Sequence, residues 1–286
     1  MEGMTIRFWG VRGSVASPGA ATREVGGNTS TVEVRCGASR FVLDAGTGMR
    51  ALGNACLSEG DTEITLLLSH LHWDHIQGLP FFVPLYLPRT RLEVLSAEVD
   101  EGNARRALAG QMRAPTFPVD WEGLPSSIVF RSLDASRECV RHGVLIRALR
   151  LPHPGGDVTA YRLDYAGRSV VYATDVERSP ELDDGLLDFA RGADVMIHDA
   201  QYTPEEYRGD VGPSRRGWGH STFETAAKLA RDADVGRLLL FHHDPAHDDD
   251  AVAEIERRAR RVFASTDAAR EGVTLELGAT PETCVA

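Results

Sequence analysis

The chain has 286 residues, of which 42% are hydrophobic and 26% charged, a composition typical of a folded globular protein and not of a disordered one. Its formal net charge is −11, and a negative surface repels long polyanions, which argues against an extended nucleic-acid footprint. The sequence has no apolar run of the roughly 18 residues that a membrane span needs, and its acidic start differs from a secretory signal, so we expect a cytoplasmic protein without membrane contact.

Short β-rich segments alternate with a few helical patterns along the chain. The expected strands are 5–9, 31–36, 40–45, 64–69, 91–96, 144–150, 158–165, 169–174, 194–199, 237–242 and 273–277. The expected helices are 48–58, 101–112, 222–232 and 248–268. Because strands adjoin helices throughout and no linker separates them, we predict one mixed α/β domain over residues 1–286.

The cysteines do not indicate a metal or redox motif. They are Cys36, Cys56, Cys139 and Cys284, and no two of them form a C-x-x-C pair, so neither a zinc ribbon nor a redox pair is expected. Proline- and glycine-rich stretches at 17–30, 151–157 and 211–220 instead indicate exposed loops, on which binding sites are often built.

The stretch SHLHWDH at 69–75 places three histidines and an aspartate directly after an apolar, strand-like run. His153, Asp175, His198 and His242 also follow such runs, and strand ends at one edge of a sheet lie close in space. Imidazole nitrogen and carboxylate oxygen suit zinc, manganese or iron rather than calcium. A set this large exceeds the ligands of one tetrahedral ion, so it favours two neighbouring metals with an aspartate between them.

The segment HLHWDH resembles the H-x-H-x-D-H signature of the metallo-β-lactamase superfamily, and the later residues follow in that family's order over nearly the whole chain. The resemblance implies an αβ/βα four-layer sandwich, with two mixed β-sheets flanked by helices and the metals at the sheet edge. The ligands it implies are His70, His72 and His153 for one metal and Asp74, His75 and His242 for the other, with Asp175 bridging both. We expect two divalent metal ions, with Zn²⁺ as the first choice and Mn²⁺ or Fe as alternatives.

The last of these ligands has a histidine neighbour. Adjacent side chains of a strand point to opposite sides, so only one of His242 and His243 should reach the metals. We choose His242 because it directly continues the apolar run, and we interpret His243 and His247 as surface or supporting residues.

Two further segments, 194–202 and 219–230, resemble the phosphodiesterase branch of this superfamily, which includes ribonuclease Z and its relatives that cleave small phosphodiesters. The resemblance implies that His220 is a general acid or oxyanion stabiliser, that Asp199 orients it, and that Asp74 belongs to the catalytic set. The alternative for His220 is a loop residue before a helix cap, and for Asp199 a structural hydrogen bond. Aspartate stands here where ribonuclease Z-like proteins have glutamate, so the orienting contact would be one methylene shorter.

The expected substrate is a small anionic phosphodiester, such as a cyclic nucleotide or a nucleotide-like diester. Ribonuclease Z carries a long tRNA-gripping arm between its third and fourth metal motifs, whereas only residues 154–174 separate His153 from Asp175 here. That gap has room for a hairpin, so no long nucleic acid is expected. A homodimer is an expectation at the level of the family.

Two other functions compete with this interpretation. The same metals could attack an acyl carbon, which would make the protein an ester, lactone or thioester hydrolase of the same fold. A non-catalytic sensor or a redox protein would be expected to lose ligands or to carry additional carboxylates and a flavin domain, and the sequence shows neither feature. His220 with Asp199 favours the phosphodiesterase, since a cationic group placed for phosphate is less needed in acyl transfer.

Three polar residues near the start of the chain have open roles. Arg12 and Asn28 lie in glycine-rich loops and could reach a substrate phosphate or simply belong to turns. Asp44 ends a strand-like run, and we interpret it as a brace for the histidine loop.

Overall fold

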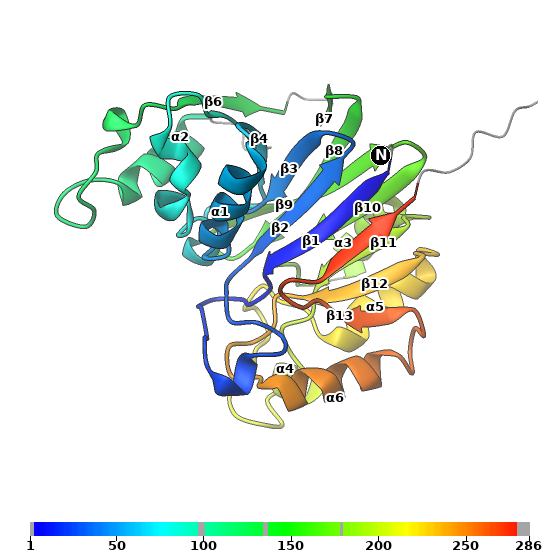
Figure 1. Cartoon of the computed structure of the whole chain (residues 1–286). Coiled ribbons are helices and arrows are strands. Elements are labelled where there is room, and N and C mark those ends of the chain that lie inside the picture. The colour runs from blue at the N-terminus through cyan, green and yellow to red at the C-terminus, as the bar shows by residue number, and fades with distance from the viewer. Residues whose placement is uncertain (1–2, 97–100, 134–136, 178–179, 279–286) are drawn as a thin grey trace, which may run out of the picture.

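The computed structural model describes residues 3–96, 101–133, 137–177 and 180–278, and Figure 1 shows their arrangement. Two seven-stranded sheets pack face to face, and helices cover the outer face of each sheet. In Figure 1, α1 and α2 lie at the left of the molecule and α6 lies at the bottom. The four-layer αβ/βα sandwich expected from the sequence is confirmed.

The first sheet has the strand order β14-β1-β2-β3-β4-β5-β6. Its strands are β1 (Met4–Gly10), β2 (Thr31–Cys36), β3 (Ser39–Leu43), β4 (Glu63–Leu68), β5 (Arg91–Ser96), β6 (Ser127–Ser132) and β14 (Thr274–Leu277). Neighbouring strands from β3 to β6 are parallel, whereas β14, β1, β2 and β3 pair antiparallel, so the sheet is mixed.

The second sheet has the order β13-β12-β11-β10-β9-β8-β7. Its strands are β7 (Glu138–Arg141), β8 (Val144–His153), β9 (Gly156–Tyr165), β10 (Arg168–Ala173), β11 (Val195–Asp199), β12 (Arg237–Phe241) and β13 (Thr266–Ala268). Strands β10 to β13 are parallel, and β7 to β10 pair antiparallel. Because two antiparallel pairings separate β8 from β10, these two strands run in the same direction and end at the same edge.

The helices are α1 (Met49–Glu59), α2 (Glu101–Gln111), α3 (Pro180–Ala190), α4 (Pro204–Arg208), α5 (Phe223–Asp232) and α6 (Asp249–Ala259). Short 3₁₀ turns are η1 (Ala20–Thr22), η2 (Trp73–His75), η3 (Leu79–Phe81), η4 (Val83–Tyr86) and η5 (Trp121–Gly123). No helix among the described residues is both long enough and apolar enough to cross a membrane.

The layered core explains why the strand segments are apolar without alternation. Along β10, Val170 and Tyr172 belong to the core between the sheets, while Val171 and Ala173 belong to the core under the helices of the second sheet. Successive side chains of a strand point to opposite faces, and both faces are covered here. The continuous apolar runs therefore follow from burial on both sides.

One predicted helix is wrong over its second half. The range 248–268 was expected to be helical, but α6 ends at Ala259, and Thr266–Ala268 form β13 beside β12. Backbone pairing with the open edge of β12 outweighs the local helical pattern there, since tertiary contacts override weak propensities. The other three predicted helices match α1, α2 and α5. The sequence interpretation did not include β6, β7, α3 or α4.

Candidate metal centre and active site

The ends of several strands place the predicted ligands in one cluster. His70 follows β4, His153 ends β8, Asp175 follows β10, and His242 follows β12. The 3₁₀ turn η2 then brings Asp74 and His75 back under the same edge. All seven residues predicted as ligands belong to groups in which one donor atom of each residue lies within 4.8 Å of the others.

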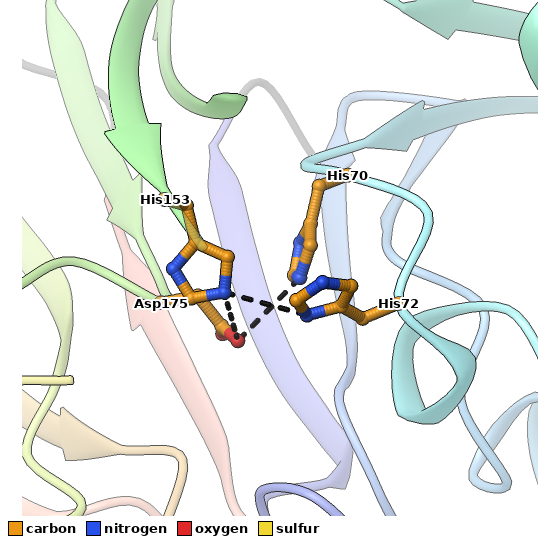
Figure 2. Close-up of side chains that lie close together, drawn as sticks. All are labelled: His70, His72, His153 and Asp175. Carbon is orange, nitrogen blue, oxygen red and sulfur yellow. Dashed lines mark hydrogen bonds and ion pairs between the residues drawn. The ribbon is translucent and has the colours of Figure 1, made fainter. Parts of the chain in front are cut away.

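The first group combines three histidines with an aspartate, and Figure 2 shows their side chains pointing toward one another. The members are His70, His72, His153 and Asp175. Asp175 Oδ2 lies 3.5 Å from Nε2 of His70 and 3.8 Å from Nε2 of His153. Nε2 of His153 lies 3.3 Å from Nδ1 of His72. These donors surround a space that one divalent ion could occupy.

The second group lies on the other side of Asp175. Nε2 of His75 is 3.2 Å from Asp74 Oδ2 and 3.2 Å from Nε2 of His242. Asp175 Oδ1 is 3.2 Å from Nε2 of each of these two histidines. The two carboxylate oxygens of Asp175 thus face different groups of possible metal ligands.

Three residues of the site have backbone conformations that residues other than glycine rarely adopt. The φ angle is +61° at Asp44, +55° at Asp175 and +59° at His242, and each residue comes directly after or near the end of a strand. Positive φ in residues with a Cβ is strained and tends to occur at functional sites. The backbone therefore turns sharply at the places where these side chains must point into the cluster.

The electrostatics of the cluster favour bound cations. Burial raises the pKa of Asp175, but the neighbouring histidines lower it well below its usual value. The pKa of Asp74 is likewise lowered, since His75 and His242 outweigh its burial. Burial holds the pKa of His70 well below its usual value, and its Nε2 is buried without a hydrogen-bond partner among the described residues. Ionised carboxylates beside a buried imidazole nitrogen that has no hydrogen bond fit divalent metal ions.

Asp44 braces the histidine loop, as the sequence indicated. Its carboxylate accepts hydrogen bonds from the backbone N–H of Ser69 at 2.7 Å, from Ser69 Oγ at 2.8 Å and from Tyr172 at 2.7 Å. It also lies 2.8 Å from Nδ1 of His75, so that Nε2 of this ring is directed into the cluster. Contacts of this kind orient metal ligands.

Several supporting contacts were not predicted from the sequence. Nδ1 of His242 lies 2.8 Å from Gln201 Oε1, and the backbone N–H of Ser14 donates to Asp74 Oδ2 at 2.8 Å. Gly13 packs so tightly that a Cβ added there would lie 2.4 Å from Nδ1 of His242. Gln201 stands inside the segment 194–202 that was singled out, but no sequence signal connects Tyr172 or Ser14 with the site.

The neighbouring histidines and Arg12 lie outside the cluster. Nε2 of His243 is 3.0 Å from the carbonyl oxygen of Ala269, and Nε2 of His247 is 2.9 Å from Glu206 Oε1. Arg12 is completely buried, and its guanidinium donates to backbone carbonyls such as that of His247 at 2.6 Å. Arg12 therefore joins loops rather than meeting a substrate.

Asn28 also serves a turn. Its backbone N–H and its side-chain amide both donate to the carboxylate of Glu271, the side-chain amide at 2.9 Å. Of the two roles open for Asn28, the structure favours the structural one.

His220 and Asp199 form a pair beside the metal cluster. Nδ1 of His220 lies 2.8 Å from Asp199 Oδ2, so the short aspartate side chain reaches the ring directly. Burial lowers the pKa of His220, but the charge and hydrogen bond of Asp199 outweigh it and raise the pKa to about 9. The ring stacks on His242 with centroids 5.0 Å apart. A protonated imidazole at this place can donate a proton or offset a negative charge.

Two hollows lie beside these residues, one lined by histidines of the cluster and the other by His220. One holds about 410 Å³ and is lined by His70, His72, His153, Asn103 and Arg106 among others. The other holds about 300 Å³ and is lined by His220, Thr222, Arg208 and Lys228 among others. Sites of a few hundred cubic ångströms suit small organic groups.

A family model and a curated relative both place this chain in one family. Residues 39–243 match the family described as Beta-lactamase superfamily domain. The chain is 30% identical over 267 residues to the ribonuclease Z of Mycobacterium avium (strain 104), and this alignment covers 86% of this chain and 87% of that protein.

Two solved structures share the fold of this chain. The metallo-beta-lactamase fold protein YhfI from Bacillus subtilis superposes with a TM-score of 0.73 at 19% identity, over 96% of this chain and 100% of that one. A diphosphatase from the PhnP family has a TM-score of 0.71 at 19% identity, over 96% of this chain and 98% of that one. At such identities these two structures support the fold alone.

Proposed function

Because the chain belongs to the metallo-β-lactamase superfamily, among its ribonuclease Z-like phosphodiesterases, it is a metal-dependent hydrolase of phosphodiester bonds, and we propose that it cleaves a small phosphodiester at a two-metal centre. The observation that carries this proposal is the position of Asp175. Its Oδ2 faces imidazoles of one group and its Oδ1 faces imidazoles of the other, at 3.2 to 3.8 Å from the nearest nitrogens.

The residues that would hold the metals are His70, His72 and His153 at one position, Asp74, His75 and His242 at the other, and Asp175 at both. Two divalent ions at these positions would supply a water of lowered pKa and would polarise the phosphoryl oxygens. We propose Zn²⁺ as the native ion, since imidazole and carboxylate are its usual ligands in catalytic sites.

The remaining step belongs to His220. Hydrolysis of a phosphodiester releases an alkoxide, which is a poor leaving group unless it is protonated. Asp199 accepts the hydrogen bond of Nδ1, so Nε2 of His220 is left to donate the proton to the leaving oxygen. The hollow of about 300 Å³ beside His220 would then take the leaving group.

A small substrate is supported by the segment between two of the predicted ligands. Residues 154–174 are used almost completely by β9 and β10, which pair as an antiparallel hairpin. No additional arm projects from this described segment. The formal net charge of −11 also disfavours a long polyanion. The competing candidate is an RNA substrate, which is favoured by the 30% identity to a protein named ribonuclease Z.

The proposal is tested by measuring hydrolysis with the metal-loaded protein and by counting the metal ions bound per chain. The substrates are bis(p-nitrophenyl) phosphate, cyclic nucleotides, a precursor tRNA and p-nitrophenyl acetate. We expect two ions per chain and cleavage of the small diesters, which His220→Ala should reduce by about 10² to 10⁴-fold on diesters with alkoxide leaving groups.

The control is His142→Ala. His142 is exposed in the turn before β8, at the opposite end of that strand from His153, so its loss should leave activity unchanged. Rapid cleavage of the precursor tRNA with inert small diesters would transfer the assignment to RNA. Cleavage of the acetate ester alone would make the protein an acyl hydrolase.

A further inference from the structure

We propose that Glu177 is a positioning residue whose carboxylate holds the loop carrying His220 at a fixed place relative to Asp175. The inference rests on the proposed function, because it concerns how the proton donor reaches the leaving group. Glu177 follows Asp175 by two residues and is not one of the residues that the sequence singled out.

Both oxygens of this carboxylate are directed at the loop before His220. Oε1 accepts the hydroxyl hydrogen of Tyr207 at 2.7 Å and the backbone N–H of Gly217 at 2.8 Å. Oε2 accepts the backbone N–H of Gly219 at 2.8 Å. Hydrogen bonds to an ionised acceptor are about twice as strong as bonds between neutral groups. One side chain therefore holds two backbone amides of the loop before His220, those of Gly217 and Gly219, and links them to α4.

The other flank of His220 is held by the same short segment. Ser221 Oγ donates to the carbonyl oxygen of Val176 at 2.5 Å. His220 thus lies between two residues, Gly219 and Ser221, that are both bonded to the segment directly after Asp175. The proton donor and the aspartate between the two metal positions are joined through contacts of neighbouring residues.

The loop needs such a partner because its own backbone is pliable. Gly212, Gly217 and Gly219 all have positive φ angles, from +74° to +87°, and regular structure resumes only with α5 at Phe223. Glycine has the greatest backbone freedom of all residues. The hydrogen bond to Asp199 fixes the orientation of the His220 ring, but it does not fix the backbone that carries the ring.

Gly219 also shows how little room the loop has to move. A Cβ added at this residue would lie 2.4 Å from Cε1 of His153, so the loop is in direct contact with a predicted metal ligand. A displacement of about 1 Å at a reacting group can reduce the rate by about 10²-fold. Without Glu177 the loop would shift, and His220 would no longer reach the leaving oxygen efficiently.

The test compares diesters that share one half and differ in the leaving group. A poor leaving group needs the proton from His220, whereas p-nitrophenolate leaves readily without it. For Glu177→Ala we expect kcat to fall by about 10 to 100-fold on an alkyl or unsubstituted phenyl leaving group. The kcat for p-nitrophenolate release and the KM values should change by less than about 3-fold, because the variant still binds the substrate and the metals.

Two variants serve as comparisons. Glu177→Asp keeps the charge and should recover part of the lost rate. Asp194→Ala removes a carboxylate that accepts the backbone N–H of Ser169 at 2.8 Å and pairs with Arg168, at the opposite end of β10. This matched control should lower the thermal midpoint without changing how kcat depends on the leaving group.

The number of metal ions bound and the thermal midpoint are measured for every variant, so loss of metal or of fold is seen directly. Equal losses on good and poor leaving groups at full metal content would overturn the inference, as would a general rise in KM, which would mean that Glu177 binds substrate. If His220→Ala shows the leaving-group effect and Glu177→Ala does not, only this inference fails. If the wild-type protein cleaves no phosphodiester, the proposed function itself fails.

Discussion

Nδ1 of His75 lies 2.8 Å from the carboxylate of Asp44, and both side chains are completely buried. The same carboxylate accepts hydrogen bonds from Ser69 and Tyr172, so one acidic group in the strained turn after β3 is shared by several buried donors. It connects elements of both sheets, because Ser69 directly follows β4 of the first sheet and Tyr172 belongs to β10 of the second.

Asp44→Ala should weaken both stability and metal binding. The variant leaves the buried donors of Ser69, His75 and Tyr172 without an acceptor, which should cost about 3 kcal/mol or more in the free energy of unfolding. Metal affinity should fall by about 10 to 100-fold, because the His75 ring loses its orientation. Denaturant unfolding and metal titration check both values. Tyr172→Phe, which removes a single donor, should cost only about 1 kcal/mol.

Asp175→Asn tests whether one carboxylate serves two metals. The amide has a single oxygen and no charge, so it cannot serve both groups of ligands equally. We expect the number of bound ions to fall from two to about one per chain, and activity to fall by more than the roughly 100-fold typical of losing a supporting contact. Metal analysis of the purified variant measures the number of ions bound per chain. An unchanged count of two ions would contradict the shared role.

Gly219→Ala should disturb the site through a steric contact. The added Cβ would approach His153 to 2.4 Å, and φ at this residue is +87°. Gly212→Ala is the matched control, because φ there is +74° but the Cβ would meet no atom within 4 Å. Both changes carry a backbone penalty of about 1–2 kcal/mol. Only Gly219→Ala should also reduce metal affinity, as measured by titration with Zn²⁺.

Trp73 is 72% exposed although it stands between His72 and Asp74. Its side chain contributes little to the core, so Trp73→Ala should change the free energy of unfolding by no more than about 0.5 kcal/mol. Denaturant unfolding measures this effect. A larger loss would show that the indole supports the turn of the metal motif, whereas unchanged stability would allow any change in KM to be assigned to substrate contact.

Glu206 gives an acid-dependent contribution to stability. Burial raises its pKa, but hydrogen bonds from His247 and from the backbone of Thr203 outweigh burial and lower the pKa from 4.5 to about 2. Because the folded-state pKa lies below the ordinary value, the ionised group stabilises the protein fully above pH 4.5, and this contribution disappears as the pH falls to about 2. The stability difference between wild type and Glu206→Gln, measured by urea unfolding, should shrink over that interval.

The sequence predicted the strands well because most of them are buried on both faces and appear as short apolar runs. β6 and β7 were missed because exposed and only partly buried positions alternate along them, so neither strand has a buried face. β13 has three residues and follows a strongly helical pattern, so its pairing with β12 could be known only from the folded chain. The assignment of residues 1–286 to one domain stays a prediction.

The ligand set could be predicted because the motif at 70–75 contains four of its members and the other three follow or end strands. The geometry now brings these residues together, while their roles toward metal and substrate stay predictions. Glu177 could not be found in this way, because an acidic residue in a turn has no distinctive sequence signal. For Arg12 the sequence signal was misleading. An arginine in a glycine-rich loop suggests a phosphate site, whereas the structure shows this residue to be completely buried.

The positive φ angles at Asp44, Asp175 and His242 lower the stability of the fold at residues whose side chains the site needs. Glycine at any of these positions would relieve about 1–2 kcal/mol of backbone strain and would delete a group of the site. At Asp44 the buried donors left without an acceptor outweigh this gain, so a library selected for thermal stability in the absence of metal should accumulate glycine only at Asp175 and His242. Selection that includes hydrolysis should keep the side chains. The residues found at these positions would therefore show whether a variant population was selected for stability alone or also for activity.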